Sequence, residues 1–176
     1  MRHLPQSKRL KKSMHWYILV YTMWIEQIID SLERHRVKYA IVGGYALALH
    51  GVVRGTVDVD MVLKISRTNY QNAEKALLEL GLTSRLPVGA DEVINFREEY
   101  ILNRNMTAWN FTHPQNPVQT VDIIITHDLS KMKVDRIKAG KRIFPVLSVR
   151  DLIIMKRKSG RPQDLEDIKA LERLHK

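Results

Sequence analysis

Apolar residues recur along this chain with two periods, one typical of helices and one typical of strands. Trp24, Ile25, Ile28, Ile29 and Leu32 share one helical face, which predicts an amphipathic helix over 24–36. The same reasoning predicts further helices over 45–50, 68–80, 129–138, 149–158 and 163–174. Short apolar runs predict strands over 38–42, 57–64, 82–86, 107–112, 119–126 and 141–147. We assign no element to 91–105.

The order of these elements predicts the fold class. Strands alternate with helices and two helices close the chain, which is typical of a mixed α/β (α+β) sheet flanked by helices. Ser66 and Ser148 are the expected N-caps of the helices that follow them. Pro114 and Pro117 mark the loop of a hairpin between strands 107–112 and 119–126. At 176 residues, we expect a single domain over 23–176.

The start of the chain differs from this pattern. Residues 1–22 contain five Lys or Arg and no acid, and we interpret them as a basic extension that is either disordered or not the native start. The apolar run from Met14 to Tyr21 lacks a small-residue cleavage site and is too short to span a bilayer. We therefore expect no membrane segment and a cytoplasmic protein. Because the chain has no cysteine, thiolate–zinc sites and cysteine nucleophiles are excluded.

A pair of glycines lies between the first strand and the helix that follows it. Ile41 and Val42 end the strand, and Gly43, Gly44 and Tyr45 lead into the helix. Without side chains, two glycines allow backbone N–H groups to approach phosphate oxygens closely, and a helix N-terminus favours anions. Such junctions also occur in α/β folds without any ligand, so this motif alone is weak.

Two carboxylates follow the glycines on the next predicted strand. Side chains alternate along a strand, so Asp58 and Asp60 share one face, about 7 Å apart along the chain, while Val59 and Met61 face the core. Two neighbouring acids repel each other unless a cation lies between them, and Mg²⁺ prefers such oxygen ligands. The alternative is a solvated polar face on an edge strand.

A third acid, Asp122, lies in the apolar strand 119–126. Three acids on neighbouring strands suit two Mg²⁺ (or Mn²⁺) ions that clamp the attacking and leaving oxygens of an in-line displacement at phosphorus. Asp122 is then the candidate to accept the proton of an incoming hydroxyl. The alternative is a capping or loop-edge acid. Arg54, four residues before Asp58, is a candidate to reach a triphosphate, or else an exposed loop arginine.

This pattern of Gly43 and Gly44, thirteen intervening residues, and then Asp58 and Asp60 between apolar residues resembles the signature of the DNA polymerase beta-like nucleotidyltransferase superfamily. The resemblance implies a mixed sheet flanked by helices and transfer of a nucleoside monophosphate from an NTP such as ATP to a hydroxyl. It also implies that Asp58, Asp60 and Asp122 bind two magnesium ions. Many members carry a serine or threonine after the glycines, whereas Tyr45 and Ala46 stand here. Phosphate contact then rests on backbone amides, Lys156 and Arg54.

The end of the chain supports one branch of that superfamily. Residues 151–156 and 160–168 are similar to the ending of AbiEii-like and related bacterial nucleotidyltransferases. In those proteins a lysine and a late aspartate lie near the nucleotide phosphates, which implies such roles for Lys156 and Asp167. The alternative for Lys156 is a side chain that only extends along its helix towards solvent. The resemblance covers about residues 24 to 174.

Charge decides which partners we expect. The net charge is +10, and residues 131–161 hold eleven Lys or Arg against Asp135 and Asp151. This basic segment suits a nucleotide and an RNA acceptor, or it is ordinary surface charge. A protein hydroxyl and a small antibiotic remain alternative acceptors, and a homodimer or partner subunit is expected to complete the acceptor site. A different class of function is a catalytically inactive nucleotide- or RNA-binding module, such as a component of a toxin–antitoxin pair.

Overall fold

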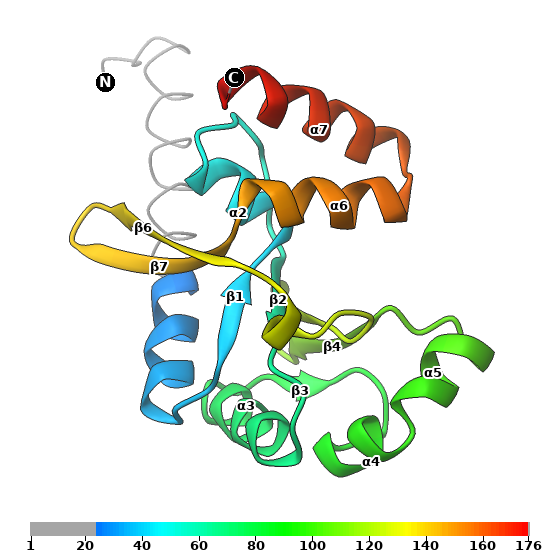
Figure 1. The fold of residues 1–176 in the computed structure, drawn as a ribbon. Coiled ribbons are helices and arrows are strands. Elements are labelled where there is room, and N and C mark those ends of the chain that lie inside the picture. Colours follow the sequence, from blue (N-terminus) through cyan, green and yellow to red (C-terminus); the bar gives the residue numbers. More distant parts are fainter. Residues whose placement is uncertain (1–23, 176) are drawn as a thin grey trace, which may run out of the picture.

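The computed structural model describes residues 24–175, and a seven-stranded sheet lies at its centre (Figure 1). The strands are β1 (Tyr39–Ile41), β2 (Val59–Leu63), β3 (Thr83–Ser84), β4 (Ala108–His113), β5 (Asn116–Ile124), β6 (Val134–Ala139) and β7 (Arg142–Leu147). Their order is β3-β4-β5-β2-β1-β7-β6, so β2 is the middle strand. It pairs parallel with β5 and antiparallel with β1. The predicted mixed α/β fold is confirmed, and the edge-strand alternative is wrong for Asp60, which lies on this middle strand.

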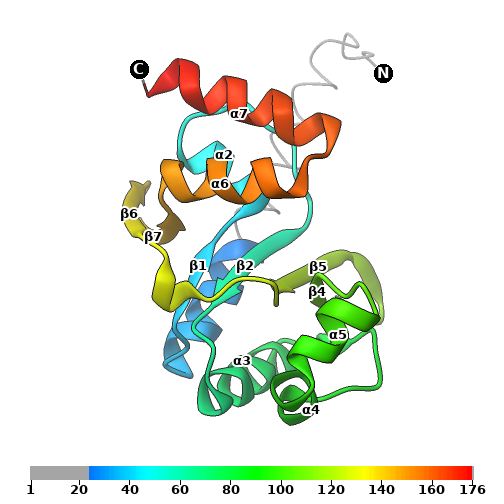
Figure 2. The same cartoon turned by 45° about the vertical axis from the view of Figure 1, so that its right-hand side comes forward.

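Seven α-helices and one short 3₁₀ helix within the described residues surround this sheet. They are a helix over 24–34, α2 (Gly43–Leu49), α3 (Arg67–Glu79), α4 (Ala90–Asn95), α5 (Arg97–Asn103), η1 (Leu129–Lys131), α6 (Val149–Ser159) and α7 (Pro162–Leu174). Figure 2 shows α6 and α7 packed together beside α2 at one end of the sheet, with α3, α4 and α5 at the other. The site described below therefore lies between two groups of helices.

Hydrophobic packing explains why these elements hold together. Trp24, Ile28 and Leu32 are buried, so the predicted apolar face of the first helix is confirmed. The indole ring of Trp109 is fully buried, with its centroid 6.2 Å from that of Tyr70 and 4.6 Å from that of Phe111. Aromatic pairs at such distances stabilise a core beyond their buried area. Trp24 and Trp109 are thus packing residues, whereas the N-terminal extension predicted over 1–22 lies outside the described residues.

The segment after β5 differs most from the prediction. A helix was expected over 129–138, but only η1 is helical and residues 134–139 form β6. Ile137 and Ala139 pack on the core while Arg136 and Lys138 are exposed, which is the alternation of a strand. Ala139 pairs with Arg142 across a two-residue loop in which Gly140 adopts φ +61°. Hairpin geometry, which depends on pairing with β7, therefore overrides local helix propensity.

Smaller differences concern the ends of elements. Residues 91–105, left unassigned, form α4 and α5. The hairpin of β4 and β5 is confirmed, although its turn is formed by residues 114–115 and Pro117 already belongs to β5. Helix α2 begins at Gly43 and ends before Gly51, whose φ is +94°. Across residues 24–175, no helix combines the length and apolar character that a bilayer crossing requires.

Candidate active site

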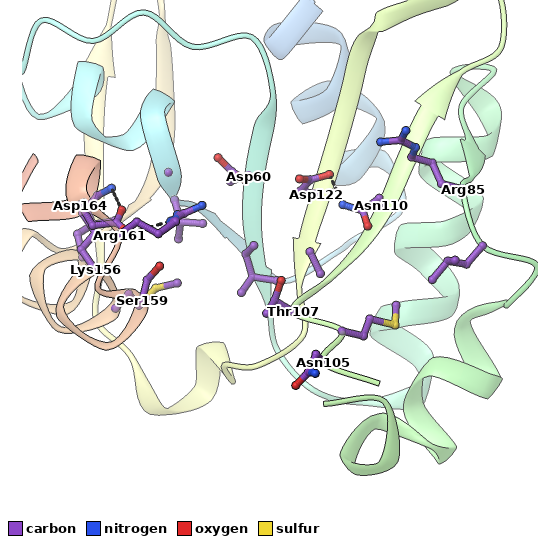
Figure 3. Close-up of a pocket in the computed structure, with 18 residues that line it drawn as sticks. Asp60, Arg85, Asn105, Thr107, Asn110, Asp122, Lys156, Ser159, Arg161 and Asp164 are labelled. Carbon is purple, nitrogen blue, oxygen red and sulfur yellow. Dashed lines mark hydrogen bonds and ion pairs between the residues drawn. The ribbon is translucent and has the colours of Figure 1, made fainter. Parts of the chain in front are cut away.

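A cleft of about 810 Å³ opens where β2 and β5 face α6 (Figure 3). Its floor carries the side chains of Asp60, Asp122 and Asn110. One wall comes from α6 and the start of α7, and includes Lys156 and Arg161. The opposite wall comes from the chain after β3 and the loop before β4. Elements that are distant in sequence therefore meet around two carboxylates.

Gly43 brings the backbone into contact with Asp60. The residue has φ +63°, a region that L side chains rarely adopt. A β-carbon at this position would lie 2.8 Å from Cβ of Asp60 and would overlap its carboxylate. The amide of Val42 donates to the main-chain oxygen of Asp60 at 2.9 Å, which holds the two segments together. Both the backbone conformation and the close approach therefore require glycine here.

Gly44 and Tyr45 have a different role from Gly43. A β-carbon on Gly44 would lie 2.5 Å from Cβ of Thr56, so this glycine allows α2 to pack against the loop that leads to β2. Gly44 is buried, and Tyr45 is partly buried against the hydrophobic core. Neither residue lines the cleft, whereas Gly43 does. Of the three residues expected to bind nucleotide at this turn, the structure places Gly43 at the cleft.

Asp60 and Asp122 lie directly opposite each other on neighbouring strands. They are register partners in the parallel pair β2–β5, so their side chains share one face of the sheet. Asn110, the register partner of Asp122 on β4, donates from Nδ2 to Oδ1 of Asp122 at 2.8 Å. Asp122 lies inside β5 rather than at a loop edge. The structure thus brings together two of the three predicted metal ligands and adds an amide that orients one of them.

Asp58 is close to this pair but is not part of the cleft lining. Strand β2 begins at Val59, so Asp58 lies in the preceding bend and is exposed. Its carboxylate accepts a hydrogen bond from the hydroxyl of Thr120, which precedes Asp122 by two residues. Among residues 24–175, no three Asp, Glu, His or Cys side chains are already gathered around one ion position. Asp60 and Asp122 form the core of the site, with Asp58 at its margin.

Burial and neighbouring carboxylates raise the proton affinity of Asp60 and Asp122. Burial, together with the negative charges of Asp122 and Asp58, raises the pKa of Asp60 to about 7, against the opposing effect of Lys156 and Arg161. Burial also raises the pKa of Asp122, although the hydrogen bond from Asn110 works in the other direction. At this site, burial and carboxylate charge outweigh the effect of the nearby cations Lys156 and Arg161. The oxygen donors of the site therefore fit a hard divalent cation such as Mg²⁺, which commonly takes one or two carboxylates plus phosphate oxygens.

Lys156 belongs to a buried ion-pair cluster. Its ammonium nitrogen lies 3.1 Å from Oδ1 of Asp164 and 2.7 Å from Oδ2 of Asp167, and all three residues are buried. Burial opposes ionisation of Asp164, but hydrogen bonds from Arg161, Ser159 and Lys156 outweigh it and lower the pKa of Asp164 to about 2. This cluster fastens α6 to α7. Two of the expected phosphate-site residues, Lys156 and Asp167, are therefore bonded to each other, and only Lys156 lines the cleft.

Two arginines flank this cluster in different ways. Arg161 pairs with Asp164 at 2.9 Å but leaves 74% of its side chain exposed, and it lines the cleft. Arg54, in the loop between α2 and β2, has its Nε 3.9 Å from Oδ1 of Asp167 and does not line the cleft. Arg161 is thus the accessible cation beside Asp60, in the position that the sequence suggested for Arg54.

Several cleft residues were not singled out from the sequence. They are Arg85, Asn105, Asn110, Ser159, Arg161 and Asp164. Arg161 and Asp164 occur in the C-terminal segment that resembles AbiEii-like proteins, so a closer reading of that motif was a usable signal. Arg85 and Asn110 carried no such signal, because only strand pairing places them beside Asp122.

Comparisons with known proteins bear on the fold. No protein-family model and no curated protein sequence matches the chain. Among solved structures, the antibiotic-resistance factor ANT(2'')-Ia in solution aligns with TM-score 0.58 and 13% identity over 85% of this chain and 80% of its own. The lincosamide antibiotic adenylyltransferase LnuA aligns with TM-score 0.55 and 17% identity over 86% of this chain and 96% of its own. A provisionally assigned nucleotidyltransferase of Thermotoga maritima aligns with TM-score 0.54 and 16% identity over 96% and 94%.

These likenesses extend over most of every chain compared, while the sequence identities are low. They show that the chain adopts the fold of nucleotidyltransferases, as the glycine and aspartate spacing predicts. At such identities a structural match reports architecture and not chemistry. The activity therefore has to be argued from the cleft itself.

Proposed function

We propose that this protein transfers a nucleoside monophosphate from an NTP to a hydroxyl acceptor and releases pyrophosphate. The observation that carries the proposal is the pairing of Asp60 with Asp122 in a cleft where the Gly43 backbone touches Asp60. Surplus negative charge on the floor calls for a divalent cation, and cationic side chains on the wall suit phosphates. The fold is the one in which ANT(2'')-Ia and LnuA are found.

The metal would be held by Asp60 and Asp122, with Asp58 available at the edge of the site. When bound, magnesium would neutralise charge on the phosphates and lower the barrier to attack at phosphorus. Burial is the main reason that the pKa of Asp60 is raised to about 7; the charges of Asp122 and Asp58 add to this effect, and Lys156 and Arg161 oppose it only in part. The same carboxylates that favour a proton favour Mg²⁺ or Mn²⁺ in its place.

The chain's own residues account for the rest of the transfer. The hydroxyl oxygen of the acceptor forms a bond to the α-phosphorus, while the bond from that phosphorus to the bridging oxygen of the β-phosphate breaks. Pyrophosphate leaves with the bonding electron pair, on the side of Arg161 and Lys156. The hydroxyl proton passes to Asp122, whose carboxylate Asn110 holds in place by a hydrogen bond.

The wall formed by α6 and α7 is suited to the triphosphate. Arg161 is the exposed cation there, and Lys156 adds positive charge from below the surface. We assign to Arg161 the direct contact with the triphosphate. Lys156 and Asp167 hold α6 and α7 together behind it. Small hydroxyl compounds are the acceptors suggested by structures of ANT(2'')-Ia with adenylyl-2''-tobramycin and of lincomycin-bound LnuA. RNA is the acceptor suggested by the basic segment 131–161, and the AbiEii-like branch remains a prediction.

Labelling tests the proposal directly. Purified protein is incubated with each NTP labelled at the α-phosphate, Mg²⁺, total RNA and a cell lysate, and labelled products are separated from free pyrophosphate. We expect transfer to require Mg²⁺ and to be abolished by Asp60→Asn and Asp122→Asn. Asp135→Asn is the matched control, since Asp135 lies in β6 outside the cleft.

The outcomes separate the two classes of function. Label in a macromolecule or small molecule with release of pyrophosphate supports the enzyme. Magnesium-dependent binding of NTP that stabilises the protein but releases no pyrophosphate supports a nucleotide-binding module. The absence of both, with wild-type protein that is folded, contradicts the proposal.

A further inference from the structure

The cleft has two cationic ends with the carboxylates between them. Figure 3 shows Lys156 and Arg161 on one side of Asp60 and Asp122, and Arg85 on the other. Arg161 is paired with Asp164, but Arg85 is exposed and has no carboxylate within ion-pair distance among residues 24–175. The hydrogen bond that Arg85 makes with β4 uses its backbone amide, which donates to the carbonyl of Asn110 at 2.9 Å. The guanidinium is therefore available to a ligand.

The two ends of the cleft are suited to different reacting groups, the leaving pyrophosphate and the acceptor. In an in-line displacement, the attacking oxygen enters opposite the leaving group. If pyrophosphate leaves towards Arg161 and Lys156, the acceptor approaches from the side of Asp122 that faces Asn110 and Arg85. This assignment rests on the proposed function, because it takes the order of the reacting groups from it.

The side chains that line the wall on the acceptor side include hydrogen-bond donors and no Asp or Glu. Besides Arg85, its polar side chains are Asn105, Thr107 and Asn110, and Leu86 and Met106 provide apolar contact. A guanidinium binds phosphate or carboxylate through paired hydrogen bonds, whereas a cationic group placed against Arg85 would meet like charge, because the carboxylates of the cleft lie on its floor and not on this wall. The amines of an aminoglycoside such as tobramycin are protonated near neutral pH, so this wall is unsuited to that class of acceptor.

We infer that the acceptor is an anion, which presents its hydroxyl to Asp122 while Arg85 binds its phosphate or carboxylate group. The nucleotides of an RNA strand and a small phosphorylated sugar both have this chemistry. The basic segment outside the cleft adds to the attraction of either anion, whereas Arg85 favours an anionic acceptor at the position where its hydroxyl reacts. Arg85 is thus a specificity-determining residue on the acceptor side.

Equilibrium binding tests this inference without requiring turnover. The probes are a short RNA oligonucleotide with a free 3′-hydroxyl, ribose 5-phosphate and tobramycin, each titrated in the presence of Mg²⁺ and a non-hydrolysable NTP. We expect at least one anionic probe to bind more tightly than tobramycin. Arg85→Ala should weaken that binding about tenfold and Arg85→Glu about a hundredfold, while Arg85→Lys retains part of it. Which anion binds distinguishes the two sources.

Controls separate this inference from the proposed function. Arg173→Ala, which removes an exposed arginine of α7 outside both the cleft and the basic segment 131–161, should leave probe binding unchanged. NTP binding should be the same in all Arg85 variants. Tighter binding of tobramycin than of both anions, or equal binding by wild-type protein and Arg85→Glu, overturns the inference. Binding that depends on Arg85 with no nucleotide transfer would instead contradict the proposed function alone.

Discussion

Gly43 and Asp60 lie so close together that no side chain fits between them. A β-carbon on Gly43 would overlap the Asp60 carboxylate, and the left-handed backbone at φ +63° disfavours any other residue independently. The turn that opens α2 and the acid that begins the site are therefore one structural unit. Their contact explains why a glycine pair and an aspartate pair occur together in the sequence.

We expect Gly43→Ala to abolish nucleotide transfer and to destabilise the fold. The backbone conformation alone costs about 1–2 kcal/mol for a residue with a β-carbon, and displacement of Asp60 adds to that. Gly140→Ala is the matched control, because Gly140 has φ +61° but no atom within 4 Å of an added β-carbon. The Gly140→Ala protein should lose a similar amount of unfolding free energy, measured by urea denaturation, because its backbone cost is the same. It should retain activity. Equal activity of the two variants would contradict the contact.

The pKa of Asp60 predicts how stability depends on pH. Burial and the charges of Asp122 and Asp58 raise this pKa from 3.8 to about 7. Between these values the folded protein holds a proton that the unfolded chain has released, so the contribution of Asp60 to stability falls as pH rises through that window. The total effect is at most about 4 kcal/mol, since each tenfold change in proton affinity is worth about 1.4 kcal/mol.

Asp60→Asn should remove this pH dependence. In urea denaturation without divalent ions, we expect the variant to gain stability over wild-type protein at pH 8 more than at pH 5. Added Mg²⁺ should stabilise wild-type protein at pH 8 and leave the variant largely unchanged. A wild-type pH profile parallel to that of Asp60→Asn would show that Asp60 ionises normally.

Lys156 is expected to matter more for stability than for direct contact with substrate. Lys156→Ala leaves Asp164 and Asp167 buried without their cation, and breaking a buried ion pair in this way costs about 3–5 kcal/mol. Lys158→Ala removes an exposed lysine from the same helix and should stay within about 0.5 kcal/mol of wild type. Chemical denaturation measures both. A fully stable Lys156→Ala protein with a raised KM for NTP would restore the direct phosphate role.

Arg161 is expected to show the opposite behaviour. Arg161→Ala should raise the KM for NTP by about tenfold to a hundredfold, because a charge-assisted hydrogen bond to phosphate is lost. Its stability should fall less than that of Lys156→Ala, because Asp164 keeps its hydrogen bonds from Lys156 and Ser159. Arg157→Ala is the control, because Arg157 is similarly exposed and pairs with Glu172 outside the cleft. Steady-state kinetics with saturating Mg²⁺ distinguish the two variants.

Elements whose burial pattern is local could be predicted from the order of residues alone. The apolar face of helix 24–34, the strands around Val59 and Ile123, and the glycine turn all follow from short-range periodicity and backbone freedom, so they were predictable. The spacing of Gly43 and Asp60 was informative because the two residues touch. Asp122 was a correct candidate for the same floor, since an acid inside an apolar strand needs a partner.

Which side chains meet depends on how strands pair and helices pack across the whole molecule. The strand β6 forms because β7 pairs with it, against a helical prediction for residues 129–138. Lys156 turns to Asp164 and Asp167 because α6 and α7 pack against each other, which leaves Arg161 at the cleft. Asn110 reaches Asp122 through the pairing of β4 with β5, and the pairing of β3 with β4 brings Arg85 to the same side of the cleft. Such contacts depend on register and on helix packing, which the local pattern of a chain does not specify.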